Sequence, residues 1–90
     1  MNVVVRSSQS GVWFGQLVRR EGGDVTLRGA RRAWLWKGAL SCSELARTGP
    51  QGGSRICGAV SRAIVLGCTE ILDATDAAAQ AWARMPEASL

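Results

Sequence analysis

Histidine and tyrosine are both missing from this chain of 90 residues, and cysteine, proline and phenylalanine are scarce. Without histidine there is no imidazole to act as a general base or to activate a serine or cysteine nucleophile. The three cysteines, Cys42, Cys57 and Cys68, form no CxxC pair, so neither a zinc site nor a disulfide framework is expected. These absences predict a protein that is not an enzyme and that uses no metal and no cofactor.

Long apolar runs are missing as well. The valine run Val3–Val5 near the start is too short for the apolar region of a signal peptide. No stretch approaches the roughly 18 apolar residues of a membrane span. Because the cysteine count is odd and no secretory signal is evident, we expect reduced thiols, a cytoplasmic location and no role at a membrane.

Lysine is nearly absent, since ten of the eleven basic residues are arginine and the formal net charge is +4. The positive charge lies mainly in the first half: residues 1–40 carry seven basic and two acidic side chains, whereas residues 69–90 carry one basic and four acidic. The planar guanidinium group suits phosphate and aromatic rings better than an ammonium group does. The excess of arginine suits a phosphate-bearing ligand, and a GC-rich genome, which favours arginine codons, explains it equally well. The net charge is too small for a protein that wraps a long nucleic acid.

Short β-branched runs separated by glycines predict most of the fold. Gly22-Gly23 predicts a hairpin turn between two strands, and residues 55–72 predict two further strands divided near Ser61-Arg62 or at Gly67. The other predicted strands are Val3–Val5, residues 12–20, 25–30 and 31–38.

Two short helices complete the prediction. Ser41 and Glu44 have the spacing of a capping box for a helix over 42–47. A glycine-rich segment, 48–54, predicts a flexible loop, and Thr75 predicts the N-cap of a second helix over about 75–85. We therefore expect one α+β domain over residues 1–90. Its fold would be a small twisted antiparallel sheet or partial barrel of five to six strands with two short helices, and it would self-associate because so small a core is marginal.

Aromatic and basic residues cluster in two stretches, GVWFG at 11–15 and ARRAWLWKGA at 30–39. In an extended strand Arg32, Trp34 and Trp36 would share one face, with Arg31, Ala33, Leu35 and Lys37 on the other. Tryptophan rings stack on nucleobases and arginines pair with phosphates, so one strand face would supply both kinds of contact. The competing interpretation makes the tryptophans core and the arginines solvated neighbours, and it remains open from the residues alone.

The candidate ligand-binding residues follow from this pattern. Arg31 and Arg32 would neutralise phosphate, and Trp34 and Trp36 would stack the base. Arg28 and Trp13 are further candidates from the neighbouring strands. The hypothesis requires that Arg32, Trp34 and Trp36 are not fully buried and have a pocket beside them.

The segments GVWFG, ARRxWxW, SxSE and TEIL together resemble a family of small uncharacterised proteins of tailed bacteriophages and prophages. The similarity spans residues 5–85, and Ala30-Arg31-Arg32 with Trp34 and Trp36 is its most specific part. The resemblance implies a phage origin and action in the host bacterial cytoplasm. It implies no biochemical activity, since none is assigned to that family.

Three functional hypotheses follow. By analogy with phage proteins that sequester immune second messengers, the first is a noncatalytic homo-oligomer that binds a phosphate-bearing small nucleotide and so inhibits anti-phage signalling. The alternative is a structural or protein-interaction oligomer with no nucleotide ligand. The second alternative is a nonspecific binder of single-stranded nucleic acid, which predicts steep salt dependence. Arg32→Ala would separate the nucleotide binder from the structural oligomer, because it would abolish nucleotide binding and leave a purely structural oligomer intact.

Overall fold

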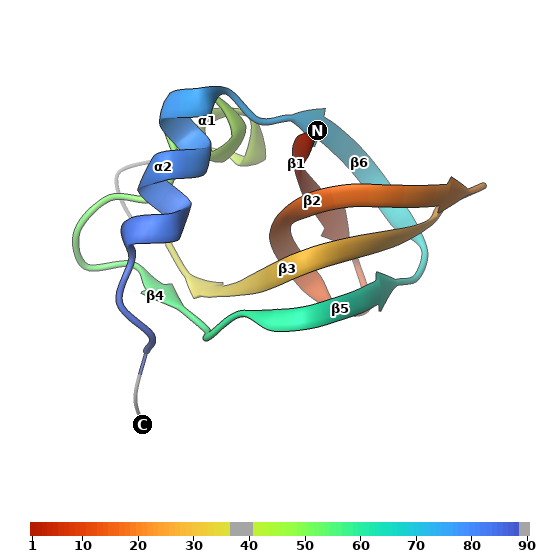
Figure 1. Cartoon of the computed structure of the whole chain (residues 1–90), viewed down its shortest axis with the longest axis horizontal. Coiled ribbons are helices and arrows are strands. Elements are labelled where there is room, and N and C mark those ends of the chain that lie inside the picture. The colour runs from red at the N-terminus through yellow and green to blue at the C-terminus, as the bar shows by residue number, and fades with distance from the viewer. Residues whose placement is uncertain (37–40, 89–90) are drawn as a thin grey trace.

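The computed structural model describes residues 1–36 and 41–88, which form six strands and two helices (Figure 1). Their order along the chain is β1 (Asn2–Ser7), β2 (Gly11–Glu21), β3 (Asp24–Leu35), α1 (Cys42–Arg47), β4 (Arg55–Ile56), β5 (Val60–Val65), β6 (Cys68–Asp73) and α2 (Asp76–Arg84). No helix within these residues is both long and apolar enough to cross a membrane.

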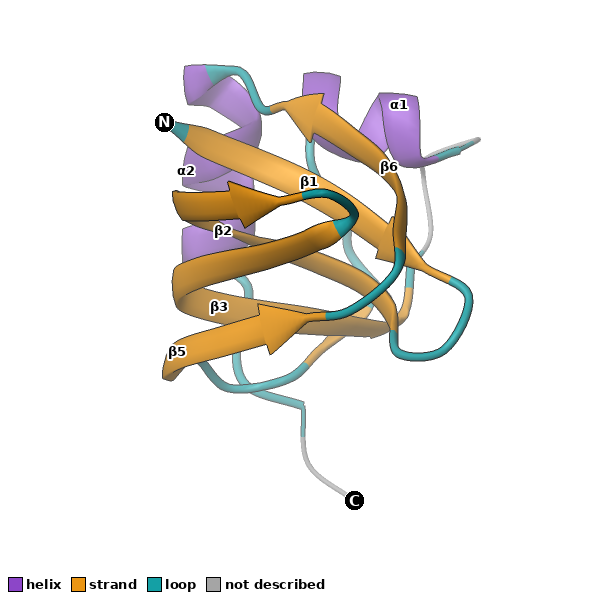
Figure 2. Ribbon diagram, turned by 90° about the vertical axis from the view of Figure 1, so that its right-hand side faces the viewer, coloured by secondary structure: helices purple, strands orange, loops and turns teal. Residues whose placement is uncertain are grey.

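The strands form one open, antiparallel sheet in the order β4-β3-β2-β1-β6, and β5 also pairs with β3. Strand β3 therefore has β2 along one side, with β4 and β5 following each other along the other side. The turn Gly22-Gly23 joins β2 to β3, and Leu66-Gly67 carries the chain from β5 to β6 across the curled sheet (Figure 2). The predicted α+β class, the hairpin and the strand boundary at Gly67 are confirmed.

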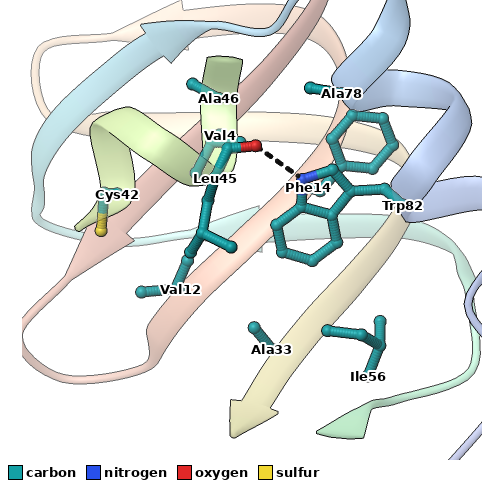
Figure 3. Close-up of a cluster of buried hydrophobic side chains, with 10 residues drawn as sticks. All are labelled: Val4, Val12, Phe14, Ala33, Cys42, Leu45, Ala46, Ile56, Ala78 and Trp82. Carbon is teal, nitrogen blue, oxygen red and sulfur yellow. Dashed lines mark hydrogen bonds between the residues drawn. The ribbon is translucent and has the colours of Figure 1, made fainter. Parts of the chain in front are cut away.

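Both helices cover one face of the sheet, and the centre of this layer is a pair of aromatic rings. Trp82 from α2 stacks on Phe14 from β2 with 5.2 Å between ring centroids, and its indole Nε1 donates to the Leu45 carbonyl in α1 at 3.1 Å (Figure 3). The tryptophan is fully buried. The cluster around it consists of Val4, Val12, Phe14, Ala33, Cys42, Leu45, Ala46, Ile56, Ala78 and Trp82.

A second apolar cluster fills the other face, where the sheet curls over itself. Its buried members are Val3, Val5, Val25, Leu27, Ala30 and Val65. Successive residues of a strand point to opposite faces, so Val4 enters the helix-covered cluster while Val3 and Val5 enter this one. The uninterrupted valine run of β1 is explained because both faces of that strand are buried.

The two predicted helix starts turned out differently. Thr75 caps α2, since its hydroxyl accepts from the Ala78 N–H at 3.0 Å. Ser41 lies at the N-cap of α1 in extended backbone, but its side chain accepts no capping hydrogen bond. The predicted capping box is therefore wrong in its chemistry, although the helix has the predicted bounds. Glu44 instead pairs with Arg47, one turn further along α1.

The loop predicted over 48–54 connects α1 to β4 and lies against α2. Gly49 has a φ of +81°, and a Cβ there would lie 2.6 Å from the Cβ of Ala81. Gly49 and Pro50 are buried. Glycine is required at this position both by the backbone conformation and by the close approach of the helix.

Candidate functional site

Arg31 and Arg32 follow each other in β3 and point to opposite faces of the sheet. Arg31 is only 8% exposed and lies on the helix-covered face. Its Nε donates to the Cys57 carbonyl at 2.9 Å, and its Nη1 donates to the carbonyls of Trp82 and Met85 at 2.7 Å each. The guanidinium thus caps the C-terminal end of α2, where unpaired carbonyls and the helix dipole favour a cation. Its donors are directed at the protein's own backbone.

Arg32 is exposed and lies on the opposite face. Its guanidinium carbon lies 4.3 Å from the centroid of the Trp13 ring, in the geometry of a cation–π contact. The two residues are brought together by strand pairing, because Trp13 of β2 stands directly opposite Arg32 of β3. Trp13 is itself held in place, since its Nε1 donates to the Ser10 carbonyl at 3.1 Å and its ring packs against the second apolar cluster.

Trp34 lies in β3 and Trp36 lies directly after its end, and an irregularity in the strand separates the two. Trp34 is 67% exposed and follows Arg32 by two residues, in a stretch where exposed and buried residues alternate. Trp36 is half-buried and packs against the helix-covered cluster. The prediction that Trp34 and Trp36 share a face is therefore wrong, because the register between β3 and β4 shifts between Ala33 and Leu35. Lys37, predicted for the opposite face, lies outside the described residues.

Arg28 is on the other side of the sheet from Arg32. It stands opposite Gln16 of β2 and Arg62 of β5, and its neighbour Leu27 points into the second apolar cluster. Between Arg28 and Arg31 the register with β2 shifts, and Gly29 in this interval has a φ of +59°. An extra residue in a bulge reverses the alternation of faces. A ligand bound at the Trp13–Arg32 pair therefore does not contact Arg28, because Arg28 points to the opposite face.

Trp13 and Arg32 thus form a contacting pair, and the exposed Trp34 follows Arg32 by two residues in β3; we name these three residues the tryptophan–arginine surface. Beside Trp13 and Arg32 is a shallow, open hollow of about 250 Å³, lined also by Cys57, Gly58 and Val60. Its walls are mostly apolar, with the guanidinium as the charged group. A site of this kind offers a flat ring, a cation and an apolar floor to a ligand.

The Cys57, Gly58 and Val60 contributions were not predicted from the sequence. Cys57 and Gly58 lie between β4 and β5, and Val60 is the first residue of β5. This part of the chain reaches the site because the Cys57 N–H donates to the Arg32 carbonyl at 2.8 Å. Cys57 carries no sequence signal that separates it from the other two cysteines. Only knowledge of the pairing between β3 and β4 identifies it as a neighbour of Arg32.

Of the other two thiols, Cys42 is buried and Cys68 is half-buried. Burial is the main cause that raises the pKa of both Cys42 and Cys68, and the nearby carboxylates of Glu70 and Asp24 respectively raise them further. Neutral, buried thiols are poor nucleophiles. In residues 1–36 and 41–88 no three cysteine or carboxylate side chains come together in a cluster that could hold a metal ion.

Comparison with protein families gives a match over nearly the whole chain. The model of a domain of unknown function (DUF6948) matches residues 1–82, from β1 into α2. No curated protein and no solved structure gives a significant match. The matched range includes Trp13, Arg32 and Trp34, as well as both clusters of buried residues.

Proposed function

The chain belongs to the DUF6948 family, and we propose that it is a noncatalytic protein that binds a phosphate-bearing small nucleotide at the tryptophan–arginine surface. The observation that carries the proposal is the Trp13–Arg32 pair at 4.3 Å, with Trp34, two residues further along β3, largely exposed. An exposed tryptophan is free to stack a base, and Arg32 has donors available for a phosphate. An exposed aromatic ring contributes little to the stability of a monomer, and tryptophan is enriched at binding surfaces.

The open shape of the hollow limits the affinity of a single copy. Small-molecule sites usually enclose most of the ligand surface, and the hollow beside Arg32 does not. We propose that a second copy closes it, since Trp34, Leu35 and Val60 are large apolar side chains that all remain exposed near the junction of β3, β4 and β5. Closure by a symmetry mate would also bury apolar surface for a chain whose own core is small.

The biological role that we propose is sequestration of an immune second messenger. The sequence resembles small proteins of tailed phages and prophages, and phages gain by removing host signalling nucleotides. A protein with this role needs a tight site and no catalytic group. The proposed place of action is the host bacterial cytoplasm.

The direct test is native mass spectrometry of protein purified from a host lysate. The proposal predicts an oligomer that carries extra mass of nucleotide size. A ligand-free protein that binds none of a panel of linear and cyclic nucleotides would contradict it. Such a result would favour the structural or protein-interaction alternative.

Arg32→Ala and Arg47→Ala form a matched pair for the same test. Both replace an exposed arginine, but Arg47 lies on α1, away from the tryptophan–arginine surface. We expect Arg32→Ala to weaken nucleotide binding at least tenfold in isothermal titration calorimetry, and Arg47→Ala to leave it within twofold. Equal losses in both variants would mean that only the net charge matters.

The open surface also favours a second candidate, nonspecific binding of single-stranded nucleic acid. Strands of DNA or RNA bind to exposed rings and cations without an enclosed pocket. Salt separates the two functions, because polymer binding weakens steeply with ionic strength and strengthens with oligonucleotide length. A small-nucleotide site has one preferred ligand, and lengthening that ligand by further nucleotides does not raise its affinity.

A further inference from the structure

Two arginines that face each other lie on the side of the sheet opposite the tryptophan–arginine surface. Arg28 of β3 and Arg62 of β5 are direct partners in the strand register. Side chains at such positions extend from the same face, with Cβ atoms about 5 Å apart, and like charges at this spacing repel. Both side chains are exposed. A sheet would gain by having a neutral or acidic residue at one of the two positions.

Neighbouring side chains on this face leave the pair uncompensated. Gln16 stands across from Arg28 on β2, and it brings an amide and no charge. The next residues along the strands are Thr26 and Ile64, which are also direct partners. Within residues 1–36 and 41–88, neither Arg28 nor Arg62 has a carboxylate within ion-pair distance.

The acidic residues nearby are already engaged. A hollow of about 250 Å³ beside the pair is lined by Arg19, Glu21, Asp24, Thr26, Arg62 and Ile64. Glu21 pairs with Arg19, and the Asp24 carboxylate accepts the Gly67 N–H at 3.1 Å in the turn before β6. Although Glu21 and Asp24 line the same hollow, within residues 1–36 and 41–88 Arg62 forms no ion pair with either carboxylate.

We propose that Arg28 and Arg62 form an anion site for a phosphate group, separate from the nucleotide site on the other face. One phosphate placed between two guanidinium groups would accept two-pronged hydrogen bonds from each and would remove their mutual repulsion. Gln16 adds an amide donor in the same row across β2, β3 and β5. The site does not depend on the tryptophan–arginine surface, because Arg28 and Arg32 point to opposite faces.

Such a phosphate has two possible sources, a free polyphosphate group or the backbone of a nucleic acid. Inorganic pyrophosphate and a ten-nucleotide oligothymidylate are the probes that separate them. If the source is a nucleic acid, Arg62→Gln lowers the slope of log affinity against log salt for the oligonucleotide by about one. If the source is a free phosphate group, the variant weakens pyrophosphate binding and leaves that slope unchanged.

The experiment compares Arg28→Gln and Arg62→Gln with Arg84→Gln, which removes the same charge from the last turn of α2. We expect each of the first two variants to weaken binding of at least one probe tenfold or more, and Arg84→Gln to change it less than twofold. Equal losses in all three variants, or no loss in any, would overturn the proposal. Thermal unfolding of each variant checks the fold, and relief of repulsion predicts that Arg62→Gln is no less stable than the native chain.

Arg32→Ala distinguishes this proposal from the proposed nucleotide site. We expect that variant to bind pyrophosphate as the native protein does, whatever its effect on nucleotides. Loss of pyrophosphate binding in Arg32→Ala, with normal binding in Arg62→Gln, would place the phosphate on the other face and would refute the second site. NMR spectra of the arginine side-chain Nε–Hε groups supply a second readout, in which the Arg28 and Arg62 signals shift and the Arg31 signal does not.

Discussion

Arg31 and Arg32 are identical neighbours in β3, and the structure uses them in opposite ways. The first is buried, donates to three backbone carbonyls and joins the sheet to the end of α2. The second is exposed and lies over the Trp13 ring. The tryptophans follow the same division, since Trp82 is fully buried under the helices and Trp34 is 67% exposed on the other side. Residue type alone thus does not separate the arginines and tryptophans of the core from those at the surface, whereas burial does.

The largest expected effect belongs to the buried tryptophan. Trp82→Ala removes the ring that stacks on Phe14 and leaves a cavity between both helices and the sheet. We expect a loss of about 4 kcal/mol in the free energy of unfolding. The matched variant Trp34→Ala should change stability by less than about 0.5 kcal/mol, because that ring is largely in solvent. Urea unfolding followed by circular dichroism measures both variants. Equal losses in the free energy of unfolding would show that the two rings do not differ in their contribution to the fold.

The arginine pair gives the next effect. Arg31→Ala leaves the carbonyls of Cys57, Trp82 and Met85 without their donor in a buried place, and we expect it to cost about 3 kcal/mol. Arg32→Ala removes an exposed cation–π contact and should cost about 0.5 kcal/mol. The same unfolding experiment applies to both. A larger loss for Arg32→Ala than for Arg31→Ala would contradict the assignment of Arg31 to the fold.

A glycine substitution tests the bulge that sends Arg28 and Arg32 to opposite faces. Gly29 has a φ of +59° with open space where a Cβ would stand, so Gly29→Ala meets only backbone strain. We expect it to lower the free energy of unfolding by about 1 kcal/mol. Gly52→Ala is the control, since Gly52 also has open space but no left-handed φ. If the two substitutions had the same effect on unfolding, a bulge at Gly29 would be excluded.

The smallest effect concerns pH. The folded chain holds the pKa of Cys42 and Cys68 above the ordinary value of a thiol, which is about 8.5. Above that pH the unfolded chain loses thiol protons that the folded chain keeps, so the free energy of unfolding falls as pH rises. Cys42→Ala with Cys68→Ala should flatten this decline between pH 8 and 10. The absence of tyrosine leaves few other groups that titrate there, and an unchanged slope would contradict the prediction.

Much of the fold was predictable because local signals agreed with the tertiary structure. Gly22-Gly23 marks the hairpin, Thr75 caps α2 and the valine run of β1 forms a strand. The site was predicted only in part, because alternation along β3 assumes an unbroken strand. Shifts in register near Gly29 and after Ala33 move Arg28 and Trp36 away from Arg32. The position of Arg31 depends on where α2 ends, and Cys57 reaches the site through its backbone hydrogen bond to Arg32, 25 residues earlier in the chain.

The most direct test of the proposed site is an NMR titration that follows the indole N–H signals. The four tryptophans are internal reporters: Trp13 and Trp34 belong to the tryptophan–arginine surface, whereas Trp36 and Trp82 pack in the helix-covered cluster. On addition of a nucleotide that the protein binds, the account predicts shifts of the Trp34 and Trp13 signals and an unchanged Trp82 signal. A ligand that shifts Trp82 and leaves Trp34 and Trp13 in place would contradict the account.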